Sequence, residues 1–210
     1  SKIALAPTTS TASISNTGKK LGELQLSLPG EHNLLNSLAA FAAATAVGAA
    51  EDKLIIGLKS FTGTRRRFEL KGEVGGVKVI DDYGHHPTEL TVTLIAAKNL
   101  AQSGRVLVVF QPHRYSRTAA FAPAFATALQ IADFTFLLEV YAASEKPISG
   151  VSSLLIAKNM TDAQVKFEPS MLTVVSEVAA MAKRGDVIIT LGAGDVSSLG
   201  EPILQALSSR

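Results

Sequence analysis

The pattern of hydrophobic and polar positions changes once along the chain, near residues 63–65. Before that point, short runs within residues 1–28 alternate polar and apolar side chains, and this period of two is typical of strands. The predicted strands are residues 2–6, 11–15 and 24–28. The segment Asn16-Thr17-Gly18-Lys19 predicts a turn between the second and the third of them.

Two helices are predicted next, over residues 31–48 and 51–61. The second has an apolar face formed by Leu54, Ile55 and Leu58. The first carries apolar residues nearly all round, and a helix of this kind is normally buried on more than one side. Residues 1–62 contain no central sheet to bury it. The segment could dock on the second half of the chain, pair with a second copy to give a homodimer, or remain loosely ordered. We favour the homodimer, because contiguous exposed apolar surface tends to find a partner.

From residue 68 onward, apolar runs alternate with helical patterns. The predicted strands are residues 77–80, 106–110, 134–140 and 187–191. The predicted helices are residues 88–100, 118–131, 151–159, 172–182 and 196–206. Apolar strands that alternate with helices indicate a mostly parallel sheet with helices on both faces, an α/β fold of the Rossmann type. The sequence thus predicts two domains, residues 1–64 and residues 65–210.

The composition indicates a soluble, folded chain. Hydrophobic residues make up 47% and charged residues 18%, with a net charge of +2, which argues against disorder and against a nucleic-acid partner. Cysteine is absent, which excludes a disulfide framework and a cysteine metal site. Residues 1–30 show no signal-peptide pattern, and the longest apolar stretch, residues 38–50, is too short to span a membrane. These features fit the cytoplasm.

Polar segments follow four of the predicted strands. They are residues 81–87, 111–117, 139–145 and 192–195. Three of the four histidines lie in two of these segments. Ligands of a parallel α/β sheet bind at the carboxyl ends of its strands, so this distribution predicts a functional site there.

The segment after the first of these strands offers two kinds of side chain. Asp81 or Asp82 could accept hydrogen bonds from ribose hydroxyls, or could simply cap a helix or a turn. His85 and His86 are adjacent and should point apart, so hydrogen bonding to a carboxylate or a phosphate is favoured over a metal site.

Two arginine groups are candidate anion binders. Arg114 and Arg117 are three residues apart and would share one face at a helix start, where they could bind one carboxylate or phosphate. The alternative is that both are solvated. The run Arg65-Arg66-Arg67 is interpreted as a linker whose arginines meet a phosphate, rather than as a nucleic-acid patch or a solvated linker.

The glycine motifs carry less information. Gly192-Ala193-Gly194-Asp195 follows a strand but lacks the third glycine of a dinucleotide-binding loop, and a tight turn alone can explain it. The single Gly-Lys pair, Gly18-Lys19, lacks the upstream glycine of a phosphate-binding loop and the Ser or Thr that should follow the lysine. These 210 residues therefore contain no such loop.

Six segments of the chain resemble the Mur ligase family. They are residues 30–36, 66–69, 81–89, 110–118, 141–145 and 192–195. The third and the fourth resemble in particular the members that add L-alanine to UDP-N-acetylmuramate. The related ligase that recycles tripeptides has a similar His-His-Pro segment but differs at residues 110–118.

The resemblance implies ATP-dependent amide-bond formation in peptidoglycan precursor synthesis. ATP would phosphorylate the muramoyl carboxylate, and the amine of L-alanine would then attack the acyl phosphate. The implied partners are UDP-N-acetylmuramate, L-alanine and ATP, with Mg²⁺ as cofactor. Residues 1–64 would be the tail of the family's central ATP-binding domain, and residues 65–210 its C-terminal domain. The family's phosphate loop and most magnesium ligands lie in that central domain, so we expect these 210 residues to be inactive alone.

The resemblance also implies roles for particular residues. Those implied on the ATP side are Asn33 and Asn36 near adenine, Arg67 at the phosphates and Asp82 at the ribose. Those implied on the amino-acid side are Tyr83, His85, Arg114 and Arg117, with the arginines on the alanine carboxylate. The alternatives are a stand-alone nucleotide-binding module without ligase activity and, less favoured, a nucleic-acid binder.

Overall fold

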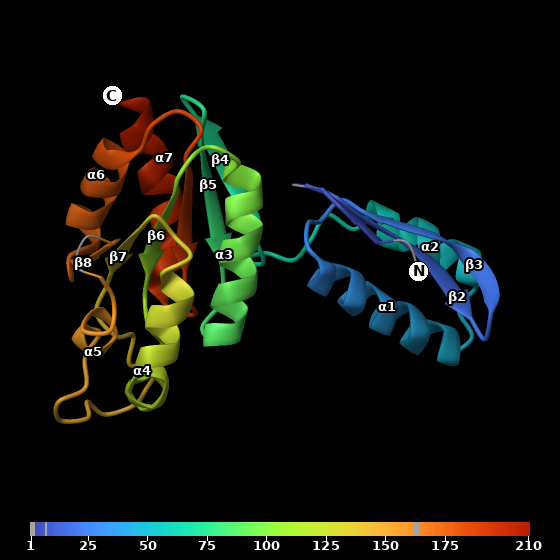
Figure 1. Cartoon of the computed structure of the whole chain (residues 1–210), viewed down its shortest axis with the longest axis horizontal. Coiled ribbons are helices and arrows are strands. Elements are labelled where there is room, and N and C mark those ends of the chain that lie inside the picture. The colour runs from blue at the N-terminus through green and yellow to red at the C-terminus, as the bar shows by residue number, and fades with distance from the viewer. Residues whose placement is uncertain (1–2, 7, 162–163) are drawn as a thin grey trace. The chain divides into compact units, whose positions relative to one another are not determined.

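The computed structural model describes residues 3–6, 8–161 and 164–210. The chain divides into two compact units, residues 1–64 and residues 65–210 (Figure 1).

The first unit is a three-stranded antiparallel sheet with two helices. The strands are β1 (Ile3–Leu5), β2 (Ser10–Asn16) and β3 (Lys19–Leu26), in the order β1-β2-β3. Thr17 and Gly18 form the predicted turn between β2 and β3, both with a positive φ angle. The helices are α1 (Glu31–Ala46) and α2 (Glu51–Ser60), and both were predicted.

The core of this unit covers only one side of α1. Leu34 and Phe41 of α1 join the buried cluster of the sheet, and the predicted apolar face of α2 packs against that cluster. In contrast, Leu35 is 61% exposed and Leu38 is 45% exposed. The second side that the sequence predicts to be buried is therefore uncovered within this unit.

The second unit contains a six-stranded sheet in the order β4-β5-β9-β6-β7-β8. Its strands are β4 (Glu69–Val74), β5 (Val77–Asp82), β6 (Val106–Phe110), β7 (Phe134–Leu137), β8 (Val165–Phe167) and β9 (Val187–Leu191). Edge strand β4 is antiparallel to β5, and all the other pairs are parallel. The predicted α/β fold with a mostly parallel sheet is confirmed.

Helices cover both faces of this sheet (Figure 1). They are α3 (Pro87–Ala101), α4 (Tyr115–Leu129), α5 (Leu154–Ala157), α6 (Met171–Met181), the 3-10 helix η2 (Asp195–Leu199) and α7 (Gly200–Ser208). Helices α3 to α5 share one buried cluster with Val108 and Phe110 of β6. Helices α6 and α7 share the other with Leu107 and Val109. Alternate residues of one strand thus enter opposite cores. None of the described helices is both long and apolar enough to cross a membrane.

Several predicted boundaries were wrong. Edge strands β4 and β8 were not predicted, because β4 is largely polar and β8 has three residues, too few to show a period. The predicted helix over residues 151–159 is a single turn, α5. The predicted strand over residues 134–140 ends at Leu137. The predicted helix over residues 196–206 begins as η2 and continues as α7.

The strand register aligns four carboxyl ends at one edge of the sheet. Asp82 pairs with Leu191, Leu191 with Phe110, and Phe110 with Leu137. The segments that follow β5, β9, β6 and β7 therefore leave the sheet side by side.

An ion pair joins β6 and β9 at the opposite edge. Arg105 Nη2 lies 2.6 Å from Asp186 Oδ2 and 2.8 Å from the Met181 carbonyl oxygen. Asp186 also accepts hydrogen bonds from the backbone N–H groups of Arg105 and Lys183. Burial acts to raise the pKa of the Asp186 carboxyl, but these hydrogen bonds and the Arg105 charge outweigh it and lower the pKa.

Candidate functional site

A row of rings crosses the carboxyl edge of the sheet. The Tyr83 and His85 ring centroids are 5.3 Å apart, and those of His85 and His113 are 5.8 Å apart. His113 stacks on Tyr141 at 5.7 Å with an interplanar angle of 18°. The structure thus brings together the segments after β5, β6 and β7, as a shared site requires.

The two arginines predicted on the amino-acid side lie beside this row. Arg117 is in the first turn of α4, and its Nη1 lies 3.2 Å from His113 Nδ1 and 3.4 Å from the His113 carbonyl oxygen. Arg114 is the N-cap residue of α4 with a φ angle of 74°, and its backbone N–H donates to the Tyr141 carbonyl at 2.8 Å. Arg114 is therefore not helical, and the helical spacing expected for this pair does not apply.

The surroundings of His113 favour the neutral form of its imidazole. Burial lowers the pKa of His113 from its ordinary value of 6.5, and the charges of Arg117, His85 and Arg114 lower it further against a weaker opposing effect of Glu145. A neutral ring can accept a hydrogen bond from the Arg117 guanidinium, whereas a protonated ring cannot.

We predict that this histidine makes residues 65–210 less stable in weak acid. The folded pKa lies below the unfolded value, so the unfolded state binds the proton more tightly. The free energy of unfolding should therefore fall as the pH drops below about 6.5 toward the folded pKa. Urea unfolding at pH 7.5 and pH 5.5 should show a smaller loss in His113→Gln than in wild type. Equal losses in the two proteins would contradict the assignment.

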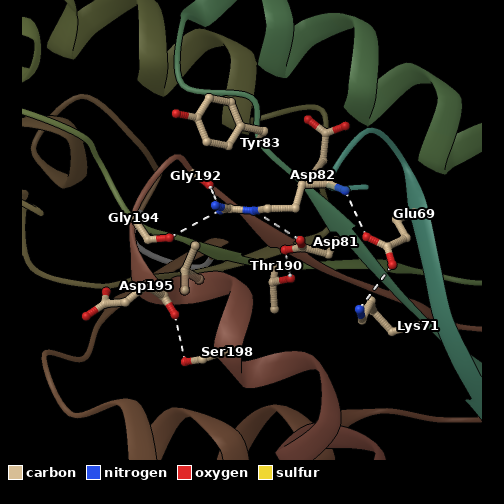
Figure 2. A network of polar contacts seen from close by, with 12 residues as sticks. Glu69, Lys71, Asp81, Asp82, Tyr83, Thr190, Gly192, Gly194, Asp195 and Ser198 are labelled. Atoms are coloured by element: carbon tan, nitrogen blue, oxygen red, sulfur yellow. Dashed lines mark hydrogen bonds and ion pairs between the residues drawn. The ribbon is translucent and has the colours of Figure 1, made fainter. Parts of the chain in front are cut away.

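The linker arginines differ in their surroundings. Arg66 Nη2 donates to the carbonyls of Gly192 at 2.6 Å and Gly194 at 3.2 Å, and its Nε lies 3.3 Å from Asp81 Oδ2 (Figure 2). The side chain of Arg67 is 54% exposed, and its Nη1 lies 4.0 Å from Glu89 Oε1. Arg67 is therefore free to meet a ligand, whereas Arg66 is bound inside the unit. The arginine run alone does not distinguish the two residues, whereas the family resemblance assigned only Arg67 to the phosphates.

Both aspartates at the end of β5 are buried and hydrogen-bonded. Asp81 accepts from the Thr190 hydroxyl at 2.7 Å. Asp82 accepts from the Phe68 and Gly84 backbone N–H groups, each at 2.8 Å, and from the Thr93 hydroxyl at 3.2 Å. Burial raises the pKa of Asp82 although these bonds oppose the effect. A carboxylate has about four acceptor positions, so about one acceptor position of Asp82 remains unused by these three donors.

The adjacent histidines have separate surroundings. His86 is the N-cap of α3: its Nδ1 accepts from the Thr88 backbone N–H at 3.3 Å, and its ring contacts Phe121. The ring of His85 joins the row instead, with Nδ1 3.1 Å from the Tyr83 carbonyl oxygen. Among the described residues, no group of three or more His, Cys, Asp or Glu side chains could hold a metal ion.

The glycine loop after β9 packs against the other segments of the edge. A Cβ at Gly192 would lie 2.5 Å from the Gln111 carbonyl oxygen, and one at Gly194 would lie 2.7 Å from Tyr141 Cγ. Neighbouring segments of the chain approach too closely for a side chain at either position, which accounts for both glycines. The buried Gln111 amide ties the loop down, donating to Asp195 Oδ1 at 2.7 Å and accepting from the Val196 N–H. Sequence reasoning missed this role, although a glutamine directly after five apolar residues is a usable signal.

The two asparagines predicted near adenine lie on α1 in the first unit. Asn33 Nδ2 donates to the Pro29 carbonyl at 2.7 Å, and Asn36 is exposed one turn later. Residues at this spacing share a helix face.

Residues 66–194 match the sequence profile described as Mur ligase, glutamate ligase domain. Since this match covers more than half of the chain, the chain belongs to the Mur ligase family. It is 50% identical over 190 residues to a UDP-N-acetylmuramate–L-alanine ligase of Mycobacteroides abscessus, covering 89% of this chain and 39% of that protein. A ligase of the same name from Mycolicibacterium smegmatis is 50% identical over 186 residues, covering 88% and 38%.

Solved structures agree with this assignment. The UDP-N-acetylmuramate-alanine ligase of Thermotoga maritima superposes with a TM-score of 0.80 at 27% identity, covering 99% of this chain and 45% of that one. The murein peptide ligase of Psychrobacter arcticus gives a TM-score of 0.71 at 26% identity, covering 100% and 44%. The chain therefore spans less than half the length of each of these four relatives.

Proposed function

We propose that the chain is the C-terminal part of an ATP-dependent ligase that joins L-alanine to UDP-N-acetylmuramate, a cytoplasmic step of peptidoglycan precursor synthesis. The observation that carries this proposal is the 50% identity, over 89% of the chain, to a relative named for that reaction. In the proposed reaction, ATP phosphorylates the muramoyl carboxylate, and the alanine amine displaces phosphate from the acyl phosphate. Such chemistry depends mainly on positioning and on charge stabilisation.

On the amino-acid side, Arg114 and Arg117 would bind the carboxylate of L-alanine, with Tyr83 and His85 lining the same side. Both guanidinium groups lie close enough to His113 to lower its pKa, so the two charges act on one small region. Guanidinium groups bind carboxylates through charge-assisted hydrogen bonds. The contact with the neutral His113 ring would orient the Arg117 guanidinium before alanine binds.

On the ATP side, Arg67 would bind the phosphates, Asp82 the ribose, and Asn33 and Asn36 the adenine. The exposure of the Arg67 side chain and the remaining acceptor position of Asp82 support these roles. The proposed enzyme uses Mg²⁺, whose ligands would lie mostly outside this chain, because the described residues include no group of three or more His, Cys, Asp or Glu side chains that could hold a metal ion.

The proposal is tested by phosphate release from ATP, using the full-length enzyme that contains this chain, UDP-N-acetylmuramate and a panel of amino acids. We expect release that depends on L-alanine, and none from the 210-residue chain, which has no phosphate-binding loop. A preference for a tripeptide over L-alanine would favour the tripeptide-recycling ligase. ATP binding by the full-length protein without release would favour a nucleotide-binding module.

We also predict that the 210-residue chain forms a homodimer through the uncovered side of α1. Leu35 and Leu38 are exposed there, and contiguous apolar surface tends to find a partner. Light scattering at tens of micromolar should give the mass of a dimer. The double variant Leu35→Glu/Leu38→Glu and a chain that begins at residue 63 should both be monomeric. A monomeric wild-type chain would contradict this prediction.

A further inference from the structure

The linker at the start of the second unit has an unusual backbone. Arg66 and Phe68 have φ angles of 58° and 51°, in the left-handed region that side chains with a Cβ rarely adopt. Strained residues of this kind persist only where surrounding contacts over-determine them, and they cluster at functional sites. Arg67 lies between the two.

Backbone contacts hold this turn in part. The Tyr83 N–H donates to the Arg66 carbonyl at 2.7 Å, the Arg66 N–H donates to Glu69 Oε2 at 2.8 Å, and the Phe68 N–H donates to Asp82. These hydrogen bonds connect the linker to β4 and β5. None of them involves the guanidinium group of Arg66, whose hydrogen-bond acceptors lie in another segment.

That guanidinium group connects the turn to the loop after β9, 126 residues away in sequence. Nη2 is shared by the Gly192 and Gly194 carbonyls. Nε is buried without a directed hydrogen bond but lies 3.3 Å from Asp81, whose side chain is 2% exposed, so the attraction is that of an ion pair (Figure 2). Arg66 therefore neutralises a buried carboxylate and fixes the linker against the glycine loop in one contact set.

Arg67, in contrast, has only loose contacts of its own. Its nearest charged partner, Glu89, is 4.0 Å away, and its Cζ lies 5.7 Å from the centroid of the Tyr83 ring. Such contacts do not fix a long side chain. The direction in which Arg67 leaves the chain is therefore set by the backbone of the turn.

We propose that Arg66 is a positioning residue, which holds the strained linker turn against the Gly192–Gly194 loop and thereby aims Arg67 at the phosphates of ATP. This inference rests on the proposed function. Arg66 itself touches no substrate in this scheme. Because Gln111 anchors the glycine loop independently, the loss of the Arg66 contacts should disturb the linker more than the loop. The Arg66 Cζ also lies 4.8 Å from the centroid of the Tyr83 ring, on the amino-acid side, so the test needs a variant that keeps a cation beside that ring.

The test uses Arg66→Lys, which keeps a charge for Asp81 but cannot reach both glycine carbonyls in the same way. In the full-length enzyme, the Michaelis constant for ATP should rise roughly 10- to 100-fold, while that for L-alanine changes less than about twofold. The matched control is Arg105→Lys, because Arg105 also binds a buried aspartate and a backbone carbonyl, at the far edge of the sheet. It should leave both constants unchanged.

A second variant tests whether Arg66 acts on ATP through Arg67. Arg67→Met should raise the Michaelis constant for ATP, and Arg66→Lys added to it should raise the constant no further, because both changes remove one interaction. Additive effects would overturn the proposal. An unchanged Michaelis constant for ATP in Arg66→Lys would overturn it as well.

Hydrogen exchange of the 210-residue chain provides a readout that does not depend on activity. In Arg66→Lys, the Phe68 and Tyr83 amides should exchange at least about 10-fold faster, while core amides such as Val108 remain protected. Faster exchange at all amides alike, or unchanged exchange at the Phe68 and Tyr83 amides, would overturn the positioning role of Arg66. A full-length wild-type enzyme without L-alanine-dependent ATP turnover would instead overturn the proposed function and, with it, the role of Arg66 toward ATP.

Discussion

Replacing Arg117 with alanine in the full-length enzyme is expected to raise the Michaelis constant for L-alanine roughly 30- to 150-fold. The physical reason is the loss of a charge-assisted hydrogen bond to the alanine carboxylate, on the order of 2 to 3 kcal/mol. The position of Arg117 in the first turn of α4, next to His113, supports this role. Initial-rate kinetics with each substrate varied in turn would measure the effect.

The expected result is selective. The Michaelis constant for ATP should change far less, because Arg117 lies beside the row of rings rather than in the linker. Arg184→Ala, at an exposed arginine in the turn before β9, is a suitable control and should alter neither constant. Equal increases for both substrates in Arg117→Ala would point to general misfolding or to a role in ATP binding.

Replacing Arg105 with methionine is expected to lower the free energy of unfolding of residues 65–210 by roughly 3 to 5 kcal/mol. The change leaves the Asp186 carboxylate buried, with two backbone N–H groups but no opposite charge. Folded domains are stable by only about 5 to 15 kcal/mol, so the loss is large. Urea unfolding at neutral pH would measure it.

The Arg105–Asp186 ion pair should also affect how the free energy of unfolding changes in acid. In wild type the pKa of Asp186 is lowered, so its contribution to stability is present above the unfolded pKa and is lost as the pH falls through the folded pKa. In Arg105→Met the pKa of Asp186 should be lowered less, so the free energy of unfolding should fall less between neutral pH and acid than in wild type. The double variant Arg105→Met/Asp186→Leu should recover much of the stability, because no buried charge remains. A double variant less stable than Arg105→Met would contradict this account.

The elements that the sequence predicts best are those whose every residue is buried. Strands β6 and β9 each have five consecutive buried residues, and their predicted limits agree with the structure. Edge strand β4 has none that is fully buried, so its composition resembles that of a loop. The register of the central strands depends on the same apolar runs. For this reason the gathering of the polar segments at one edge was predictable.

The difference between Arg66 and Arg67 was not predictable from their neighbours in sequence. It arises because two left-handed residues turn the chain, and because the carbonyl acceptors of Arg66 lie 126 and 128 residues away. The same holds for Asp82, whose three donors come from Phe68, Gly84 and Thr93. The residue type indicates which chemistry a side chain can perform. Hydrogen bonds to groups that are distant in the sequence determine which of its atoms remain free for a ligand.

The place of β9 in the sheet has a consequence for synthesis on the ribosome. Strand β9 lies between β5 and β6, so no strand joins β5 to β6 until residues 187–191 have left the exit tunnel. Until then the nascent chain has two half-sheets with open apolar edges, β4-β5 and β6-β7-β8. Such unpaired edges are prone to aggregation, and pairing that spans so much sequence is slow. Translation stalled before residue 187 should therefore leave a product that depends on chaperones and is degraded.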